Sequence, residues 1–110
     1  MRILITGGAG YLGGALTDIL RTSEHDVRVY DALLYEESYR KDISFVYGDV
    51  RDHEKLQAQL DWAEVIVWLA AIVGDPACAL NERLTMDVNV HALRYAAEHF
   101  VGKLIVMSSC

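Results

Sequence analysis

The sequence predicts an α/β protein built on a doubly wound parallel sheet, and three observations support this prediction. Short apolar runs alternate along the 110 residues with stretches of helical periodicity. Residues 65–69 are wholly apolar, which is the pattern of a parallel strand covered on both faces. A glycine-rich segment at residues 6–13 connects the first apolar run to the first amphipathic stretch. Because strand–helix alternation implies right-handed crossovers, we expect about five strands in the order 3-2-1-4-5.

The expected elements follow one another along the chain. Strands are predicted over residues 3–5, 26–31, 43–47, 65–69 and 103–107. The first helix is expected over residues 11–22, with one buried face made of Leu12, Ala15, Leu16, Ile19 and Leu20. Asp52 is the expected N-cap of a second helix through Leu60, and residues 82–100 form a long helix that Gly102 stops. Residues 33–42 are expected to be a loop or a frayed turn, and residues 70–80 a loop of small residues.

The glycine-rich segment has the spacing of a dinucleotide-binding turn. Gly8, Gly10 and Gly13 form a Gly-x-Gly-x-x-Gly pattern, and Gly7 precedes it. Gly7 and Gly8 permit backbone angles that a Cβ would forbid. Gly10 lets the main chain approach a pyrophosphate, and Gly13 lets the helix pack tightly on the strand. The N–H groups and positive dipole end of that helix then bind the phosphates. The alternative is a tight strand-to-helix turn without a ligand.

Asp31 ends the second predicted strand, in which Val27 and Val29 alternate with Arg28 and Tyr30. It follows the glycines by roughly 20 residues, where a dinucleotide fold has the acid that binds a ribose 2′-hydroxyl. A carboxylate there repels a 2′-phosphate, and residues 32–34 include no arginine to accept one. The sequence therefore favours NAD over NADP. The alternative for Asp31 is a solvated strand end.

Composition and charge narrow the function further. With 53% hydrophobic residues, 24% charged residues and one proline, the chain is expected to be globular, and no apolar run reaches the ~20 residues of a membrane span. The net charge of −6 disfavours nucleic acid and anionic membranes as partners. Cys78 and Cys110 suggest neither a disulfide framework nor a metal site, and a cytoplasmic location is predicted. The histidines at 25, 53, 91 and 99 are expected to be surface or packing residues, and the tryptophans at 62 and 68 core residues.

Several short motifs occur in order along the chain. They are Thr6-Gly-Gly-Ala-Gly-Tyr-Leu-Gly13, Gly48-Asp-Val-Arg-Asp52, Leu69-Ala-Ala71, Asn89-Val90 and Ser108-Ser109. In these motifs the chain resembles the extended short-chain dehydrogenase/reductase superfamily, the NAD-dependent nucleotide-sugar epimerases and dehydratases. The resemblance covers essentially the whole chain. It implies a Rossmann-like fold with NAD as the cofactor and a nucleotide sugar as the substrate.

The resemblance also assigns roles to individual residues. It implies cofactor contacts by Gly7, Gly10, Tyr11, Leu12, Gly13, Asp31, Asp49, Val50, Leu69, Ala70, Ala71 and Asn89. In the family the segment around Asp49 contacts the adenine, and residues 69–71 lie along the ribose and pyrophosphate. Ser109 is the candidate that polarises a substrate hydroxyl, and Ser108 is the second candidate. The alternatives are a local hydrogen-bonded turn at Asp49, a structural bond from Asn89 to a loop carbonyl, and an ordinary chain end at the serines.

The chain departs from the family in lacking the Tyr-x-x-x-Lys pair on which the chemistry depends, and the substrate-binding C-terminal part is absent. Residues 1–110 are therefore expected to be a truncated NAD-binding domain, the cofactor half of an enzyme that transfers a hydride to and from a sugar carbon. The alternative is a non-catalytic dinucleotide-binding module with a regulatory or redox-sensing role. Because strand 103–107 would form an unprotected sheet edge, we also expect self-association or dependence on the missing half.

Overall fold

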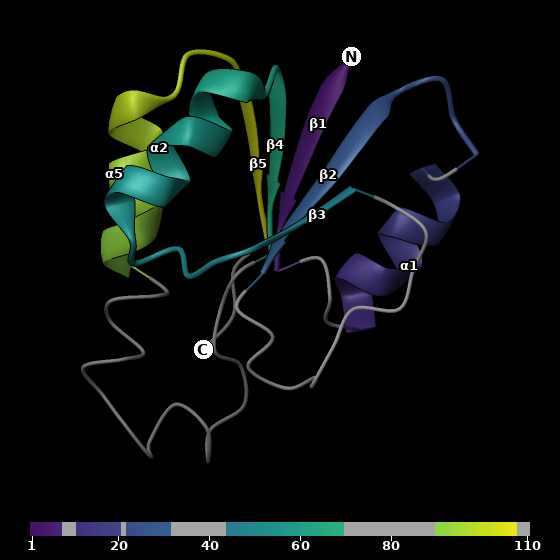
Figure 1. Cartoon of the computed structure of the whole chain (residues 1–110), viewed down its shortest axis with the longest axis horizontal. Helices are drawn as coiled ribbons and strands as arrows, with labels where there is room; N and C mark the ends of the chain where they lie inside the picture. The colour runs from purple at the N-terminus through teal and green to yellow at the C-terminus, as the bar shows by residue number, and fades with distance from the viewer. Residues whose placement is uncertain (8–10, 21, 32–43, 70–89, 108–110) are drawn as a thin grey trace.

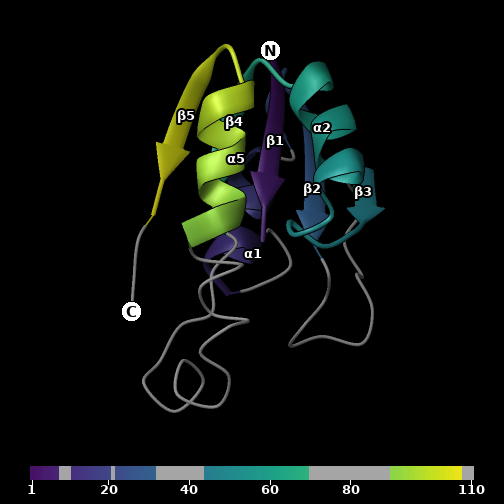
Figure 2. The ribbon, with the colours of Figure 1, turned by 90° about the vertical axis from the view of Figure 1, so that its left-hand side faces the viewer.

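The structure of the chain is a computed structural model that describes residues 1–7, 11–20, 22–31, 44–69 and 90–107. One parallel sheet is formed by β1 (Arg2–Thr6), β2 (Asp26–Asp31), β3 (Ser44–Tyr47), β4 (Val65–Trp68) and β5 (Lys103–Val106). The strand order is β3-β2-β1-β4-β5, so the predicted sheet and its order are confirmed. Figure 2 shows the strands side by side, with β1 in the middle of the sheet.

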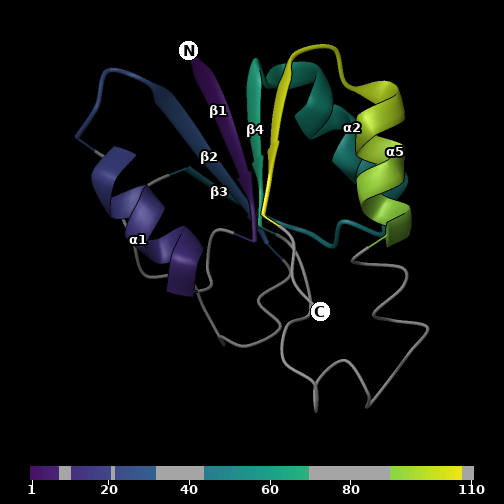
Figure 3. The ribbon, with the colours of Figure 1, turned by 180° about the vertical axis from the view of Figure 1, so that it is seen from behind.

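The helices that the structure describes cover both faces of this sheet. α1 (Tyr11–Leu20) lies on one face, and α2 (His53–Trp62) and α5 (Ala92–His99) lie on the other (Figure 1). Figure 3 shows the same three layers from behind. Because the strands are all parallel and have helices on both faces, the sheet is doubly wound, as the sequence predicts.

The larger part of the hydrophobic core lies between the sheet and the helices α2 and α5. Leu4, Tyr30 and Ile66 point into this layer from the central strands and are completely buried. Leu56 of α2 and Ala96 of α5 meet them from the helix side. Full burial of one aliphatic side chain contributes about 1.5–3 kcal/mol. This layer therefore fixes α2, and with it the turn that precedes α2, on the sheet.

Helix α1 packs on the sheet with a face that differs from the predicted one. Ile19 is 71% exposed and Ala15 is exposed, although both were expected to be buried. The residues of α1 that face the sheet are Gly13, Leu16, Thr17 and Leu20. Small residues on this face let the helix backbone approach the strands closely. Thr17 tolerates full burial because its hydroxyl donates a hydrogen bond to the Gly14 carbonyl at 2.9 Å.

The predicted start of α2 is confirmed by its cap. The side chain of Asp52 accepts a hydrogen bond from the backbone N–H of Lys55 at 3.1 Å. This bond satisfies one of the N–H groups that the first turn of a helix leaves without an internal partner. The helix continues to Trp62, slightly beyond the predicted end at Leu60.

Gly102 does not cap the long helix, so the predicted role of this glycine as the helix stop is wrong. Helix α5 ends at His99, and Phe100 caps it with an extended backbone. A Cβ atom at position 102 would lie 2.7 Å from the carbonyl oxygen of Glu64. Glycine is therefore needed at 102 because the chain enters β5 in close contact with the backbone before β4.

Strand β5 forms one edge of the sheet. Among the described residues it pairs with β4 alone. Ile105, Val106 and Met107 are 42%, 40% and 52% exposed. Apolar side chains and an outward-facing backbone therefore occur together at this edge.

Some expected features lie outside the described residues: the loops at 33–42 and 70–80, and residues 82–89 of the long helix. The described part of the chain includes no helix that is long and apolar enough to cross a membrane. It also includes no group of three His, Cys, Asp or Glu residues placed to hold a metal ion.

Candidate functional site

Backbone hydrogen bonds continue the sheet past the carboxyl ends of its strands. From N–H to carbonyl oxygen they are Gly7 to Tyr30 (2.9 Å), Gly48 to Asp31 (3.0 Å), Leu69 to Thr6 (2.9 Å) and Met107 to Trp68 (3.2 Å). Because the strands are parallel, these bonds align the exits of all the strands along one edge. Open α/β sheets bind their ligands outside this edge, at the point where the strand order reverses. In this sheet that point lies between β1 and β4.

The glycine-rich turn leaves β1 through Gly7, whose φ of 74° lies in the left-handed region. A residue with a Cβ would be strained there, so the backbone itself requires glycine. Helix α1 begins at Tyr11 and has no acidic residue in its first turn. An anion at its N-terminus would therefore meet N–H groups and the positive dipole end without a competing carboxylate from that turn. Gly13, in the same turn, is buried.

Asp31 is the last residue of β2, at the same edge of the sheet. Its partner in register on β3 is Tyr47. On the other side, the pairing of Thr6 with Tyr30 brings Gly7 beside Asp31. The partly buried Asp31 therefore stands between the exit of β1 and the exit of β3, next to the glycine-rich turn.

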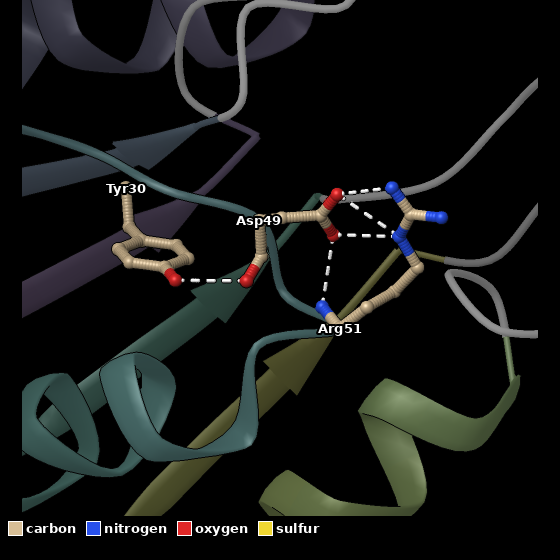
Figure 4. A network of polar contacts seen from close by, with 3 residues as sticks. All are labelled: Tyr30, Asp49 and Arg51. Atoms are coloured by element: carbon tan, nitrogen blue, oxygen red, sulfur yellow. Dashed lines mark hydrogen bonds and ion pairs between the residues drawn. The ribbon is translucent and has the colours of Figure 1, made fainter.

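The turn between β3 and α2 contains Asp49, whose carboxylate binds Arg51. Oδ1 accepts hydrogen bonds from the backbone N–H of Arg51 at 2.9 Å and from Nε at 3.0 Å. Oδ2 accepts from Nε at 2.9 Å and also from Nη2. Figure 4 shows the guanidinium group facing the carboxylate. These hydrogen bonds hold the pKa of the Asp49 carboxyl below its usual range, although partial burial acts in the opposite direction.

Tyr30 fixes the other side of this turn. The side chain is completely buried, and its hydroxyl donates a hydrogen bond to the carbonyl oxygen of Asp49 at 2.8 Å (Figure 4). Burial raises the pKa of Tyr30 far above its ordinary value, and the negative charges of Asp52 and Asp49 raise it further. The hydroxyl is therefore a neutral donor at physiological pH.

Sequence reasoning assigned no role at this turn to Tyr30 or Arg51. Two signals could have found them. An aromatic residue directly precedes Asp31, and an arginine follows two positions after an aspartate in a predicted turn. Short polar side chains in turns bind nearby backbone groups, so a local Asp49–Arg51 contact follows from turn chemistry. The local turn considered as the alternative at Asp49 is thus present.

Val50 and Leu69, two predicted cofactor contacts, have side chains that pack inside the protein. Val50 is 6% exposed and belongs to the core under α2 and α5. Leu69 is partly buried beside the residues that α1 covers. A contact from Val50 to a cofactor would therefore come from its main chain.

Two buried polar atoms at the carboxyl edge have no hydrogen-bond partner within the described part of the chain: Thr6 Oγ1 and Trp68 Nε1. Thr6 and Trp68 are paired in register at the ends of β1 and β4. The predicted core position of Trp68 is confirmed, since it is 1% exposed. Buried polar atoms without partners are rare in proteins and call for an explanation. Here they lie where the strand order reverses.

Outside the described residues, in whole or in their side chains, are Gly10, Tyr11, Leu12, Ala70, Ala71, Asn89, Ser108 and Ser109. The backbones of Tyr11 and Leu12 form the start of α1. The described chain ends at Met107, directly before the serine pair.

Comparison with known proteins supplies the family. The model of the NAD-dependent epimerase/dehydratase family matches residues 3–110. The chain belongs to this family. The resemblance indicated by the sequence motifs is thereby confirmed, and so is the Rossmann-like fold that it implied.

Relatives of this epimerase/dehydratase family member are longer than the chain. An uncharacterized protein of Mycobacterium tuberculosis is 29% identical over 109 residues, which make up 99% of this chain and 12% of that protein. The UDP-glucose 4-epimerase of Thermus thermophilus, solved in complex with NAD, is 25% identical with a TM-score of 0.79, over 90% of this chain and 33% of the epimerase. The Bordetella bronchiseptica enzyme WbmG, also in complex with NAD, is 28% identical with a TM-score of 0.78, over 96% of this chain and 36% of that enzyme. The chain thus spans about a third or less of the length of these proteins.

The described residues of this family member fit a dinucleotide. The start of α1 offers N–H donors for phosphates, and Asp31 offers carboxylate oxygens as acceptors for ribose hydroxyls. Gly7, in its left-handed conformation, connects β1 to the turn that leads to α1. Donors and acceptors of the kinds that a dinucleotide needs therefore occur together at the carboxyl edge.

Proposed function

We propose that the chain is the NAD-binding half of an NAD-dependent nucleotide-sugar epimerase or dehydratase. The observation that carries this proposal is the position of Asp31 at the end of β2, beside Gly7 at the exit of β1. Membership of the NAD-dependent epimerase/dehydratase family supports it. We expect the protein to act in the cytoplasm.

In this proposal each part of the carboxyl edge binds one part of NAD. The pyrophosphate lies at the N-terminus of α1, where Gly10 lets the main chain approach it. Asp31 accepts hydrogen bonds from the adenosine ribose. The turn with Asp49 and Val50 contacts the adenine, and residues 69–71 and Asn89 lie along the rest of the cofactor. When bound, the nicotinamide supplies a hydride acceptor and donor for a sugar carbon.

The substrate end of the site lies beyond β5. Ser109 is our candidate for polarising a hydroxyl of a nucleotide sugar, with Ser108 as the second candidate. Met107, directly before them, is bound through its N–H to the Trp68 carbonyl at the carboxyl edge. General acid–base groups typically contribute 10²–10⁴-fold to rates, and these 110 residues contain no Tyr-x-x-x-Lys pair to act in that role. We therefore expect no nucleotide-sugar turnover by this chain alone.

The second candidate function is a dinucleotide-binding module without catalysis, which senses redox state or regulates a partner. A protein whose full sequence carries no Tyr-x-x-x-Lys pair would fit this candidate, and these 110 residues contain none. Both candidates require NAD binding at the same edge. The two candidates differ in one respect: only the first expects the protein that contains this chain to epimerise or dehydrate a nucleotide sugar. An activity assay on that protein, with and without a Ser109→Ala substitution, separates them.

Calorimetric titration with NAD and NADP tests the proposal. We expect tighter binding of NAD, because the Asp31 carboxylate accepts the ribose hydroxyls and repels a 2′-phosphate. Asp31→Asn should reduce the difference in binding affinity between NAD and NADP. Asp26→Asn is the matched control, because it removes the same charge from the exposed first residue of the same strand, at the opposite edge. Equal or reversed affinities in the wild type would contradict the assignment of Asp31.

A further inference from the structure

Thr6 and Trp68 bring two polar side chains into the same buried layer of the protein. The two residues are paired in register at the ends of β1 and β4. Thr6 lies on the same face of β1 as Leu4, two residues earlier, because side chains alternate along a strand. Leu4 and Trp68 both belong to the core under α2 and α5. Since Thr6 is 0% and Trp68 1% exposed, the hydroxyl and the indole N–H are neighbours that bulk solvent does not reach.

These two groups need a hydrogen-bond partner that the described part of the chain does not supply. The indole N–H can only donate, whereas the hydroxyl can both donate and accept. Leaving such groups unpaired inside a protein is costly, and native structures rarely do so. Thr17, an equally buried threonine, donates to the Gly14 carbonyl at 2.9 Å. The missing partner of Thr6 and Trp68 must accept from the indole and bond with the hydroxyl.

The surroundings restrict this partner to a small neutral molecule. The side chains that share the layer include Val50, Ile66 and Ala92, which are apolar, so an ion there would have no counter-charge among them. The burial of Thr6 and Trp68 leaves no opening for a large ligand. The two polar atoms are not hydrogen-bonded to each other, and a water molecule between them can bond to both.

We propose that Thr6 and Trp68 form a binding site for one internal water molecule, which accepts a hydrogen bond from the indole N–H and shares another with the threonine hydroxyl. Two polar partners are sufficient to hold an internal water. This water connects the side chains of β1 and β4 at the point where the strand order reverses. The site lies inside the core layer, so the inference does not depend on the proposed NAD binding.

Crystal structures of the wild-type chain, grown with and without NAD and at a resolution that defines ordered water, test the proposal. We expect one water oxygen within about 3.2 Å of both Trp68 Nε1 and Thr6 Oγ1, in the same place in both crystals. A direct bond between the two side chains would overturn the proposal. So would a protein group or an oxygen of NAD that takes the place of the water.

The indole N–H signals of a nitrogen-15-labelled chain test the same site in solution. The chain has two tryptophans, so Trp62, which is partly exposed and stacks on the Arg28 guanidinium, is an internal reference for folding. In the wild type we expect cross-relaxation between water and the Trp68 indole proton. Thr6→Val keeps the side-chain shape but removes the hydroxyl, so it should abolish this cross-relaxation and move the Trp68 signal upfield.

Two matched variants make the solution test specific to this hydroxyl. Thr6→Ser keeps the hydroxyl and should preserve both the Trp68 signal and its cross-relaxation with water. Thr17→Val removes the hydroxyl of the other buried threonine and should leave both unchanged. A Trp68 signal that is the same in Thr6→Val as in the wild type, with Trp62 reporting a folded chain, would overturn the proposal. If Thr6→Val does not fold, the wild-type crystals decide.

Discussion

A Cβ atom at position 48 would lie 2.5 Å from the hydroxyl oxygen of Tyr30. The backbone directly after β3 therefore lies against the phenol ring of Tyr30, which extends from β2 into the core. Tyr30 is fully buried and its hydroxyl binds the carbonyl oxygen of Asp49, the next residue after Gly48. This packing fixes the turn that carries Asp49 and Arg51 at the carboxyl edge of the sheet.

The first prediction is that Gly48→Ala destabilises the fold by about 1–3 kcal/mol, the usual cost of overpacking a well-packed site. The ring of Tyr30 is buried and cannot move away from the added methyl group. Urea unfolding measures the change. In a Tyr30→Leu background the same substitution should cost less, because leucine lacks the ring atoms that the methyl group would meet. A Gly48→Ala variant as stable as the wild type would refute this packing relationship.

The second prediction concerns alkaline pH. The pKa of Tyr30 is raised in the folded chain above its ordinary value of about 10, so folding favours the neutral phenol. This stabilisation is fully present below about pH 10 and is lost as the pH rises further toward the folded value. Tyr30→Phe should lower the free energy of unfolding by about 0.5–1.5 kcal/mol at pH 7. Above pH 10 the variant should lose less stability than the wild type. Unfolding curves from pH 8 to 11 measure this, with Tyr47→Phe, at a 61% exposed tyrosine, as the control.

The third prediction concerns acid pH. Hydrogen bonds from Arg51 lower the pKa of Asp49 in the folded chain below its ordinary 3.8. The stabilisation is therefore present above about pH 4 and is lost as the pH falls through the folded value. Because the Arg51 side chain is 43% exposed, Arg51→Gln should cost no more than about 1 kcal/mol at pH 7. It should also flatten the fall in stability below pH 4, whereas Arg94→Gln should not. Identical acid profiles for the wild type and Arg51→Gln would contradict the assignment.

The fold could be predicted because its strands are apolar runs bounded by turn residues. The wholly apolar stretch at 65–69 became β4, and Asp52 caps α2 as its residue type suggests. The buried face of α1 could not be predicted by counting apolar residues. Close approach to the sheet favours Gly13 and Thr17 on that face, and it leaves Ile19 in solvent.

The candidate site was predicted less completely than the fold. The position of Asp31 followed from its offset after the glycines, because a strand and a helix of ordinary length separate them. Tyr30 was assigned by alternation to one face of β2, but the sheet is covered on both faces, so alternation does not separate buried from exposed residues there. The bond from Tyr30 to Asp49 depends on the pairing of β2 with β3, which a single strand pattern does not specify.

The fourth prediction is that the chain self-associates through β5. Its backbone edge and the exposed Ile105, Val106 and Met107 form a template for strand pairing. Light scattering over a range of concentrations should show a mass that rises with concentration. Ile105→Lys should shift the chain toward monomer, whereas Ile19→Lys, at a 71% exposed position on α1, should not. A monodisperse wild-type monomer at all concentrations would count against this prediction.

The central claim is that NAD binds along the carboxyl edge of the sheet, and amide chemical-shift mapping tests it most directly. The chain is labelled with nitrogen-15 and titrated with NAD. We predict shifts that saturate with NAD for Gly7, Gly13, Asp31 and Arg51, at the exits of β1, β2 and β3 and the start of α1. Asp26 and Gly102, at the opposite edge, should not shift. An absence of shifts at saturating NAD, or shifts confined to the opposite edge, would contradict the claim.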